Sequence, residues 1–408
     1  MKAFFVIGNP QHHAAMMTPV MRELAARGHA VDVLSLAELR GLPTPVIDVE
    51  SVHMHKLFPA GVRRSKGVVV LANSVSSSAE SAARKVAREI LWRTALGPAL
   101  RWHMMWLPDV VVLPNDTAFP YDRMRALVQQ RGIRTVLVQE GIRFPIPIEQ
   151  RAGTPYGAGG CSRVCAWGEE SGAHFAAAGA PRDTIAVTGN PRFDDVDSEH
   201  IEQLRRGAGE TRARHGLTPR TLLYLSNPVD DQGFMTTAEK LRLFADVLAL
   251  AAPVLQEADA TMAVRLHASE DAAGFARAIA RSPASSRVRL VEGASLHELL
   301  AAATAAIVLS STVGLEALLF GLPLGVIALP GYGPVHDYVR AGAAERLDVD
   351  DTLPVRLRGL LEGASAASTG PWAEARAAYV ERHLAFRGEA AQRIADEVLA
   401  VPLARSAA

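Results

Sequence analysis

Three consecutive hydroxyl side chains and one glutamate stand out in the segment AIVLSSTVGLEALLFGLPLGVIALPG, residues 306–331. Ser310, Ser311 and Thr312 follow a short apolar run and precede an apolar helix, so we expect them at a helix N-terminus. Free N–H groups and the helix dipole suit a phosphate there. Glu316 lies one turn inside that helix, where an unpaired carboxylate is costly and could accept hydrogen bonds from ribose hydroxyls. The pattern predicts a nucleotide site, with simple helix capping as the alternative.

The residues around this segment indicate a strand, a helix and a second strand with tight connections. Gly321 fits the position just past a helix end, and Pro323 follows where a helix cannot continue. Gly314 could let a phosphate approach the helix closely, or it could only relieve packing. Apolar strands of this kind are typical of a parallel sheet that is covered on both faces.

Strand-like and helix-like segments alternate along most of the chain without sequence repeats, which predicts two doubly wound α/β domains. We place the first domain at residues 1–195 and the second at 196–370. A C-terminal helical segment, 371–408, is expected to cross back to the first domain. The expected strands are Phe4–Gly8, Val31–Ser35, Asp109–Leu113, Thr135–Gln139, Val164–Ala166, Ile185–Val187, Leu222–Leu225, Met262–Leu266, Val288–Val291, Ile307–Leu309 and Leu324–Leu329.

Polar residues follow nearly every predicted strand. Ligands of doubly wound sheets bind outside the C-terminal ends of the strands, and two such domains that face each other would share one cleft. The candidates from the first domain are the loop from Gly8 to His13, which includes His12, then Asn115 and Asp116, and then Gln139, Glu140 and Arg143. Those from the second domain are Ser226, Asn227, His267, Glu292, Gly293 and the segment from Ser310 to Glu316.

The composition excludes several classes of protein. The 408 residues carry 43 basic and 43 acidic side chains, and a net charge of zero disfavours a nucleic-acid binder or a polybasic membrane protein. The two cysteines, Cys161 and Cys165, match no zinc pattern and indicate unpaired thiols in a reducing compartment. No signal peptide and no apolar run of about 18 residues is evident, so we expect a cytoplasmic protein with no integral membrane segment. The Ala- and Arg-rich composition hints at a bacterial source.

Four motifs resemble the GT-B superfamily of nucleotide-sugar enzymes. They are GNPQHHAAMMTPVMRELAARGHAVDVL at 8–34, VTGNPRFDDV at 187–196, VRLHASED at 264–271 and SSTVGLEALLFGLP at 310–323. The superfamily includes glycosyltransferases, UDP-N-acetylglucosamine 2-epimerases and teichoic-acid glycerophosphotransferases. The resemblance implies two Rossmann-like domains facing across a cleft, with the acceptor in the first and the nucleotide-sugar donor in the second. It implies no further cofactor and no metal.

Inverting glycosyltransferases of this fold often use a histidine after the first strand as general base, a role that suits its near-neutral pKa. The resemblance therefore implies His13 or His12 as the base, with Asp116 as the acid that orients it. The hydroxyls at the helix N-terminus, together with His267, would stabilise the departing diphosphate. In similar enzymes the region of His336 and Asp337 touches the donor sugar.

The sequence departs from the other branches of the superfamily. Asp116 matches an epimerase acid, but the basic run expected after Leu225 is absent, and Gln139 stands at the aligned catalytic acid unless Glu140 substitutes. The glycerophosphotransferases carry a His-Gly pair where this chain has Glu140 and Gly141. We therefore predict a metal-independent, inverting glycosyltransferase that acts on a natural product or surface glycan. An epimerase-like isomerase or hydrolase and a non-catalytic nucleotide-sugar-binding module are the alternatives, and a homodimer is left open.

Overall fold

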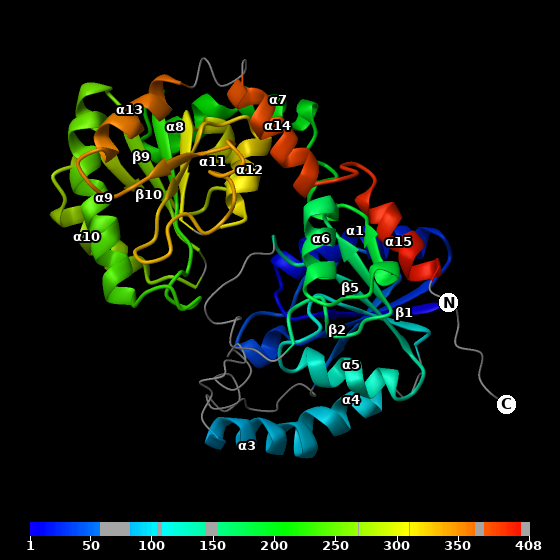
Figure 1. The fold of residues 1–408 in the computed structure, drawn as a ribbon. Helices are drawn as coiled ribbons and strands as arrows, with labels where there is room; N and C mark the ends of the chain where they lie inside the picture. The colour runs from blue at the N-terminus through cyan, green and yellow to red at the C-terminus, as the bar shows by residue number, and fades with distance from the viewer. Residues whose placement is uncertain are drawn as a thin grey trace. The chain divides into compact units, whose positions relative to one another are not determined.

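The computed structural model describes residues 1–57, 82–103, 108–142, 154–267, 269–309, 311–363 and 371–400. Contacts divide the chain into two compact units. One is built from the described residues up to Asp197 together with those from Arg382 onward, and the other is Ser198–Glu381. Each unit has one parallel sheet with helices packed on it, so the predicted α/β class is confirmed (Figure 1).

The sheet of the first unit has seven strands in the order β3-β2-β1-β4-β5-β6-β7. All neighbours pair in parallel, so β1 has β2 on one side and β4 on the other. The strand β3 was missed from the sequence, because the side chains of VHMHK are largely polar and partly exposed. The strands are β1 (Lys2–Ile7), β2 (Ala30–Ser35), β3 (Val52–Lys56), β4 (Val110–Leu113), β5 (Arg134–Val138), β6 (Arg163–Ala166) and β7 (Ile185–Val187).

Helices cover both faces of this sheet, since alternate residues of β1 belong to different cores. Phe4 and Val6 pack with residues of α4, α5 and α6, whereas Phe5 and Ile7 pack with residues of α1 and α15. Both cysteines are free and buried here, as expected. The helices are α1 (His12–Ala26), α3 (Ala82–Leu91), α4 (Gly97–His103), α5 (Tyr121–Gln129), α6 (Glu169–Ala177) and α15 (Ala390–Ala400), with a π-helical turn at Trp92–Leu96 and short 3₁₀ turns at Ala37–Arg40, Arg182–Thr184 and Pro191–Phe193.

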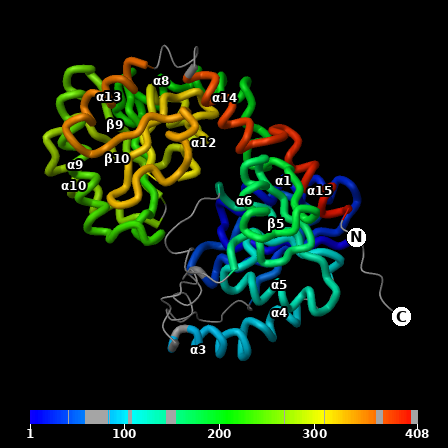
Figure 2. The backbone as a smooth tube through the Cα atoms, viewed as in Figure 1, coloured from blue at the N-terminus to red at the C-terminus, as the bar shows by residue number. Residues whose placement is uncertain are grey.

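The last helix, α15, is held beside α1 by one carboxylate (Figure 2). Both oxygens of Asp194 accept backbone N–H groups just before or at the start of this helix, those of Gly388, Ala390 and Ala391, at 2.8 to 3.0 Å. These donors have no partner within the helix, so a carboxylate there satisfies them and matches the helix dipole.

The sheet of the second unit has six parallel strands in the order β10-β9-β8-β11-β12-β13. The three-residue edge strand β13 was missed from the sequence. The strands are β8 (Thr221–Leu225), β9 (Thr261–Arg265), β10 (Val288–Leu290), β11 (Ala305–Val308), β12 (Leu324–Ile327) and β13 (Glu345–Leu347).

One face of this second sheet forms a core with α9, α10 and α13. In α14 the chain passes from the second unit to the first, at Arg382. The helices are α7 (Ser198–Arg206), α8 (Ala208–His215), α9 (Thr237–Glu257), α10 (Ala272–Arg281), α11 (Leu296–Ala302), α12 (Val313–Leu319), α13 (Leu353–Glu362) and α14 (Pro371–His383), with a 3₁₀ turn at Ser285–Arg287.

The carboxylate of Asp194 predicts a specific loss of stability. Asp194→Ala should lower the free energy of unfolding by about 1–3 kcal/mol, because three backbone donors lose a charged acceptor. Urea unfolding followed by circular dichroism measures it. The control is Asp195→Ala, whose side chain is exposed and which should change stability by less than about 0.5 kcal/mol. Equal effects of the two substitutions would contradict the capping role.

Candidate functional site

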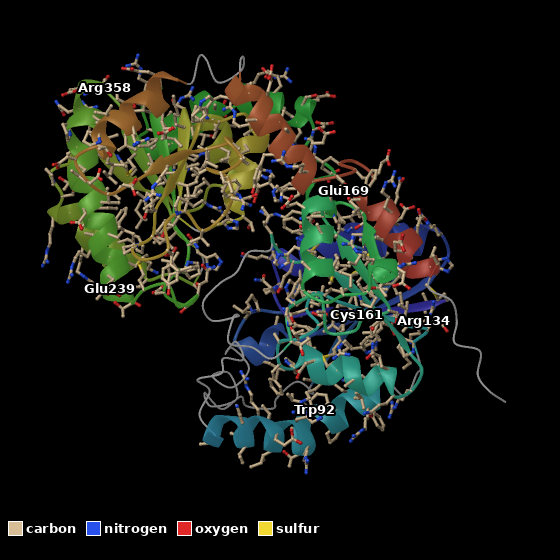
Figure 3. All side chains as sticks on the ribbon, viewed as in Figure 1. Trp92, Arg134, Cys161, Glu169, Glu239 and Arg358 are labelled. Atoms are coloured by element: carbon tan, nitrogen blue, oxygen red, sulfur yellow. The ribbon has the colours of Figure 1, made fainter. Side chains whose placement is uncertain are left out.

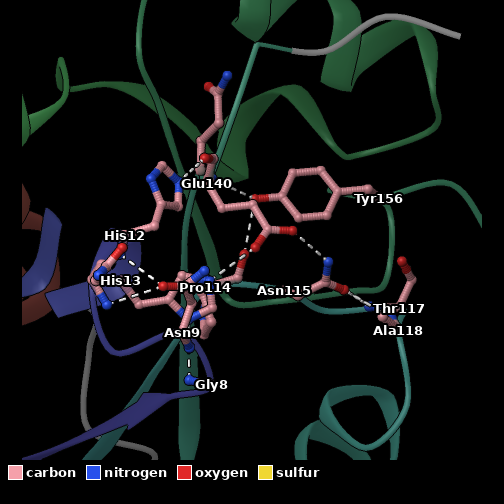
Figure 4. A network of polar contacts seen from close by, with 12 residues as sticks. Gly8, Asn9, His12, His13, Pro114, Asn115, Thr117, Ala118, Glu140 and Tyr156 are labelled. Atoms are coloured by element: carbon pink, nitrogen blue, oxygen red, sulfur yellow. Dashed lines mark hydrogen bonds and ion pairs between the residues drawn. The ribbon is translucent and has the colours of Figure 1, made fainter. Parts of the chain in front are cut away.

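The strand order of the first sheet brings three polar loops together. The chain runs outward in one direction from β1 to β2 and β3, and in the other direction from β4 onward. Ligands of doubly wound sheets bind at such a switch point, outside the strand ends. The loops after β1, β4 and β5 meet there and form one hydrogen-bonded network (Figure 4).

His13, in the first turn of α1, is buried and accepts two backbone hydrogen bonds. Its Nδ1 accepts from the N–H groups of Gly8 and Asn9, each at 3.1 Å. A ring nitrogen that faces two donors carries no hydrogen, so the ring hydrogen is on Nε2. Nε2 donates it to Oε2 of Glu140 at 3.1 Å. The fold therefore fixes the tautomer of His13 and directs its one N–H at a carboxylate.

Glu140 is held at both carboxylate oxygens and on its backbone. Oε1 accepts from Nδ2 of Asn115 at 2.8 Å, and the N–H of Glu140 donates to the Tyr156 hydroxyl at 3.0 Å. That hydroxyl in turn donates to the carbonyl of Pro114. The Glu140 side chain is still 26% exposed. The contacts orient this carboxylate, and its partial exposure leaves it accessible to a bound molecule.

Asn115 is oriented for this contact by its own loop. Its Oδ1 accepts the backbone N–H groups of Thr117 and Ala118 at 3.0 and 2.8 Å. This side-chain turn leaves the amide nitrogen facing Glu140. Asn115 was among the residues expected at this strand end, whereas Tyr156 was missed, because its partners Glu140 and Pro114 lie far away along the chain.

His12 contacts the same glutamate through the backbone. Its Nε2 donates to the carbonyl of Glu140. Burial, together with the nearby His13 and Arg192, lowers the pKa of His12 from 6.5 to about 4. Because it donates its ring hydrogen to a carbonyl, His12 has a structural role at the site.

Asp116 is not the partner of a histidine, which corrects the expected pairing. It is fully buried, and its two oxygens accept the backbone N–H groups of Gly157 and Gly159 at 2.9 and 2.8 Å. Burial raises the pKa of this carboxyl, although the two backbone hydrogen bonds oppose the shift. Asp116 holds the segment around Gly157 against the end of β4, and Glu140 takes the place at His13.

Gln139 and Gly8 also have structural roles in place of the expected cleft contacts. Gln139 is fully buried, accepts the backbone N–H of Trp167 at 2.8 Å, and donates to the carbonyl of Gly141 and the hydroxyl of Ser171. A Cβ atom at Gly8 would lie 1.9 Å from the hydroxyl of Tyr121, so any larger residue would have to displace that side chain. The geometry therefore favours the alternative expectation, that Glu140 takes the role of the acid that aligns with Gln139.

In the second unit the switch point lies between β8 and β11, and the predicted donor segment follows β11. Glu316 is 1% exposed, and its Oε2 lies 3.1 Å from Nε2 of His297 in α11. This hydrogen bond accounts for an acid inside an apolar helix. The Oγ of Ser311 accepts the N–H of Val313, so this hydroxyl caps the helix, whereas Thr312 makes no side-chain cap.

Several other predicted donor residues are engaged within the unit. A side chain at Gly314 would lie 2.9 Å from the ring of Tyr338, so this glycine serves packing. The ring of His336 also packs on Tyr338, and Asp337 accepts the hydroxyl of Tyr379 at 2.6 Å. These contacts do not support the expected sugar contact of Asp337. Ser310 and Arg143 lie outside the described residues.

A buried lysine under the loop after β8 was missed from the sequence. Lys240 is 4% exposed, and its Nζ lies 2.6 Å from Asp230 and 3.1 Å from Glu270. Glu270 also accepts the hydroxyl of Ser226 and the backbone N–H of His267. The network ties the ends of β8 and β9 together. The signal was available, since Lys240 falls on the apolar stripe of α9 with Leu243, Phe244 and Val247.

The remaining predicted residues lie at these strand ends. Asn227 is buried, and its amide lies 3.5 Å from Gln232 in the same loop. His267 is exposed, and its Nδ1 contacts the hydroxyl of Ser269 at 2.8 Å. Among the described residues, no three His, Cys, Asp or Glu side chains are grouped so that they could hold a metal ion.

Comparisons with known proteins give a fold but no family. No family model matches the chain, and no curated protein sequence matches it. The putative UDP-N-acetylglucosamine 2-epimerase of Listeria monocytogenes has a TM-score of 0.60 at 14% identity, over 97% of this chain and 95% of that chain. The UDP-GlcNAc 2-epimerase of Neisseria meningitidis, bound to UDP-GlcNAc, has a TM-score of 0.58 at 15% identity, over 98% and 100%.

A transferase is also similar to the chain. The calicheamicin glycosyltransferase CalG4 has a TM-score of 0.57 at 16% identity, over 100% of this chain and 99% of that chain. At such identities the similarity shows the fold alone. The fold is GT-B, with two Rossmann-like units, as the four motifs predicted.

The shifted pKa of His12 predicts a pH dependence of stability. The unfolded chain binds a proton at His12 near pH 6.5 and the folded chain only near pH 4, so stability falls as the pH falls through this window. His12→Gln should remove about 2 kcal/mol of the loss between pH 7 and pH 5. Urea unfolding at the two pH values measures it. If wild type and variant lose equal stability, His12 is not held uncharged by the fold.

Proposed function

We propose that the chain is a nucleotide-sugar-dependent glycosyltransferase in which Glu140 is the general base. The observation that carries the proposal is the Glu140 carboxylate, held on one oxygen by His13 and on the other by Asn115, and still partly exposed. The fold supports the use of a nucleotide sugar as substrate, since proteins of the same fold include one bound to UDP-GlcNAc and a glycosyltransferase.

A single proton acceptor is what glycosyl transfer requires. An acceptor hydroxyl attacks the anomeric carbon only as a base begins to take its proton. The new carbon–oxygen bond forms as the bond to the diphosphate breaks, and the nucleoside diphosphate leaves with the bonding electrons. The proton ends on Glu140 and passes to water. In-line attack of this kind inverts the anomeric centre.

His13 acts as a positioning residue in this scheme. Its Nδ1 is engaged by two backbone donors, so the ring cannot accept a proton there without losing both bonds. Its N–H fixes the orientation of the Glu140 carboxylate instead. This replaces the histidine base expected from the resemblance.

The second unit is proposed to bind the nucleotide at the switch point between β8 and β11. Glu316 would accept hydrogen bonds from the ribose hydroxyls, and His297 would hold its carboxylate in place. The polar ends of β8 and β9, tied by Lys240 and Glu270, provide a rigid frame beside it.

An epimerase acting on a UDP-amino sugar is the second candidate, because proteins described as epimerases share the fold. Epimerisation at a carbon must remove a proton from one face and return one to the other, which calls for two acid–base groups. Two of the positions that the resemblance offered, Asp116 and Gln139, are bonded into the interior. The geometry at this switch point therefore favours transfer.

Replacing the proposed base tests the reaction. Glu140→Gln should lower kcat by about 10²- to 10⁴-fold, because the amide cannot take a proton. Release of nucleoside diphosphate from a panel of nucleotide sugars, with and without candidate acceptors, gives the rate, and EDTA should not change it. The control is Glu169→Gln, an exposed glutamate at the start of α6 (Figure 3). A Glu140→Gln enzyme with wild-type kcat would exclude this base.

Hydrogen exchange separates the two candidate reactions. In D₂O a transferase leaves the hydrogen at C2 of UDP-GlcNAc in place, whereas an epimerase replaces it with deuterium. Proton NMR of the recovered UDP-GlcNAc reports the difference directly. Deuterium at C2 in the absence of any acceptor would favour the epimerase over the transferase.

The donor site is tested by ligand stabilisation. A nucleotide at about 100 times its dissociation constant should add about 2.7 kcal/mol to the stability of the wild type. Glu316→Gln should lose most of that increment, measured as a thermal shift with UDP and other nucleotides. Glu374→Gln, an exposed glutamate in the same unit, is the control and should keep it. Full stabilisation of the Glu316→Gln protein would remove Glu316 from the donor site.

A further inference from the structure

A long helix of the first unit exposes apolar side chains to solvent. It consists of α3, the π-helical turn that begins at Trp92, and α4, which lie end to end (Figures 1 and 3). The side chains of Val86 and Ile90 are each 57% exposed, and that of Trp102 is 67% exposed. The buried side of this helix is formed by other residues, including Leu96 and Leu100.

The π-helical turn keeps the three exposed residues on one side. Twelve residues separate Ile90 from Trp102, and an unbroken α-helix would rotate Trp102 about a third of a turn away. The wider turn, with its i→i+5 hydrogen bonds, takes up most of this rotation. We call the row of Val86, Ile90 and Trp102 the apolar stripe.

Cationic side chains border the apolar stripe. Residues 82–103 contain five Arg or Lys and one acidic residue, a formal charge of +4 in a chain whose net charge is zero. Lys85, Arg93 and Arg101 are exposed. The acid, Glu89, is paired with Arg93 at 2.6 Å and with Arg123 of α5 at 3.2 Å. The net charge of the whole chain therefore conceals one strongly basic helix.

We propose that this helix binds the surface of an anionic membrane. A helix that lies in the interface buries Trp and aliphatic side chains at the headgroup boundary, while Lys and Arg meet the anionic headgroups. A nucleic acid would match the charges but not the apolar stripe. A second copy of the chain would set two basic surfaces against each other. No helix in the described ranges is long and apolar enough to cross a bilayer, so the contact is with the surface.

Vesicle flotation of the full chain tests the proposal independently of the glycosyltransferase assignment. The wild type should float with vesicles containing phosphatidylglycerol and not with vesicles of phosphatidylcholine alone, and high salt should weaken the binding. The triple variant Val86→Ser/Ile90→Ser/Trp102→Ser should bind at least tenfold more weakly. Lys85→Glu/Arg101→Glu should weaken binding by about fivefold or more for each charge removed.

Matched controls come from the second unit. Val355→Ser and Arg277→Glu change side chains that are 66% and 67% exposed, and both should bind as the wild type does. Circular dichroism checks that every variant is folded. Failure of the wild type to float with anionic vesicles at low salt would overturn the proposal, as would undiminished binding by the triple variant. A dimer that the triple variant loses, without vesicle binding by the wild type, would assign the apolar stripe to a second copy instead.

Discussion

The candidate site depends on two hydrogen bonds from the backbone to one ring nitrogen. The N–H groups of Gly8 and Asn9 both point at Nδ1 of His13, and this fixes where the ring hydrogen is. The hydrogen on Nε2 then holds the carboxylate of Glu140. The loop after β1 thereby fixes the orientation of the glutamate that we propose as the proton acceptor.

The order of strands explains why these residues meet. In each sheet the chain reverses its direction of growth next to the first strand, at β1 and β4 in one unit and at β8 and β11 in the other. Polar loops follow the strands at each switch point, which is where ligands of doubly wound sheets bind. In the second unit the polar groups include two buried acids that contact basic side chains, Glu316 with His297 and Glu270 with Lys240. Removing one partner from such a pair is costly, so these pairs fix the loops around them.

The sequence predicted the fold well because buried parallel strands are short apolar runs between turn residues. It missed Val52–Lys56, which lies at the edge of its sheet and alternates with polar residues. The sequence identified the loops that form the site but not the hydrogen bonds between them. His13 and Glu140 are 127 positions apart, and a hydrogen-bond partner leaves no local sequence pattern. Lys240 is different, because its position on the apolar face of α9 predicts that it is buried and therefore needs an acidic partner.

The tautomer of His13 is the most direct test of the account. Nitrogen-15 NMR of the folded protein, labelled at histidine and compared with a His13→Gln variant for assignment, shows which ring nitrogen carries the hydrogen. The account predicts a hydrogen on Nε2 and none on Nδ1 near neutral pH, with Glu140 as the proton acceptor. A hydrogen on Nδ1, with Nε2 bare, would contradict it and return the role of base to His13.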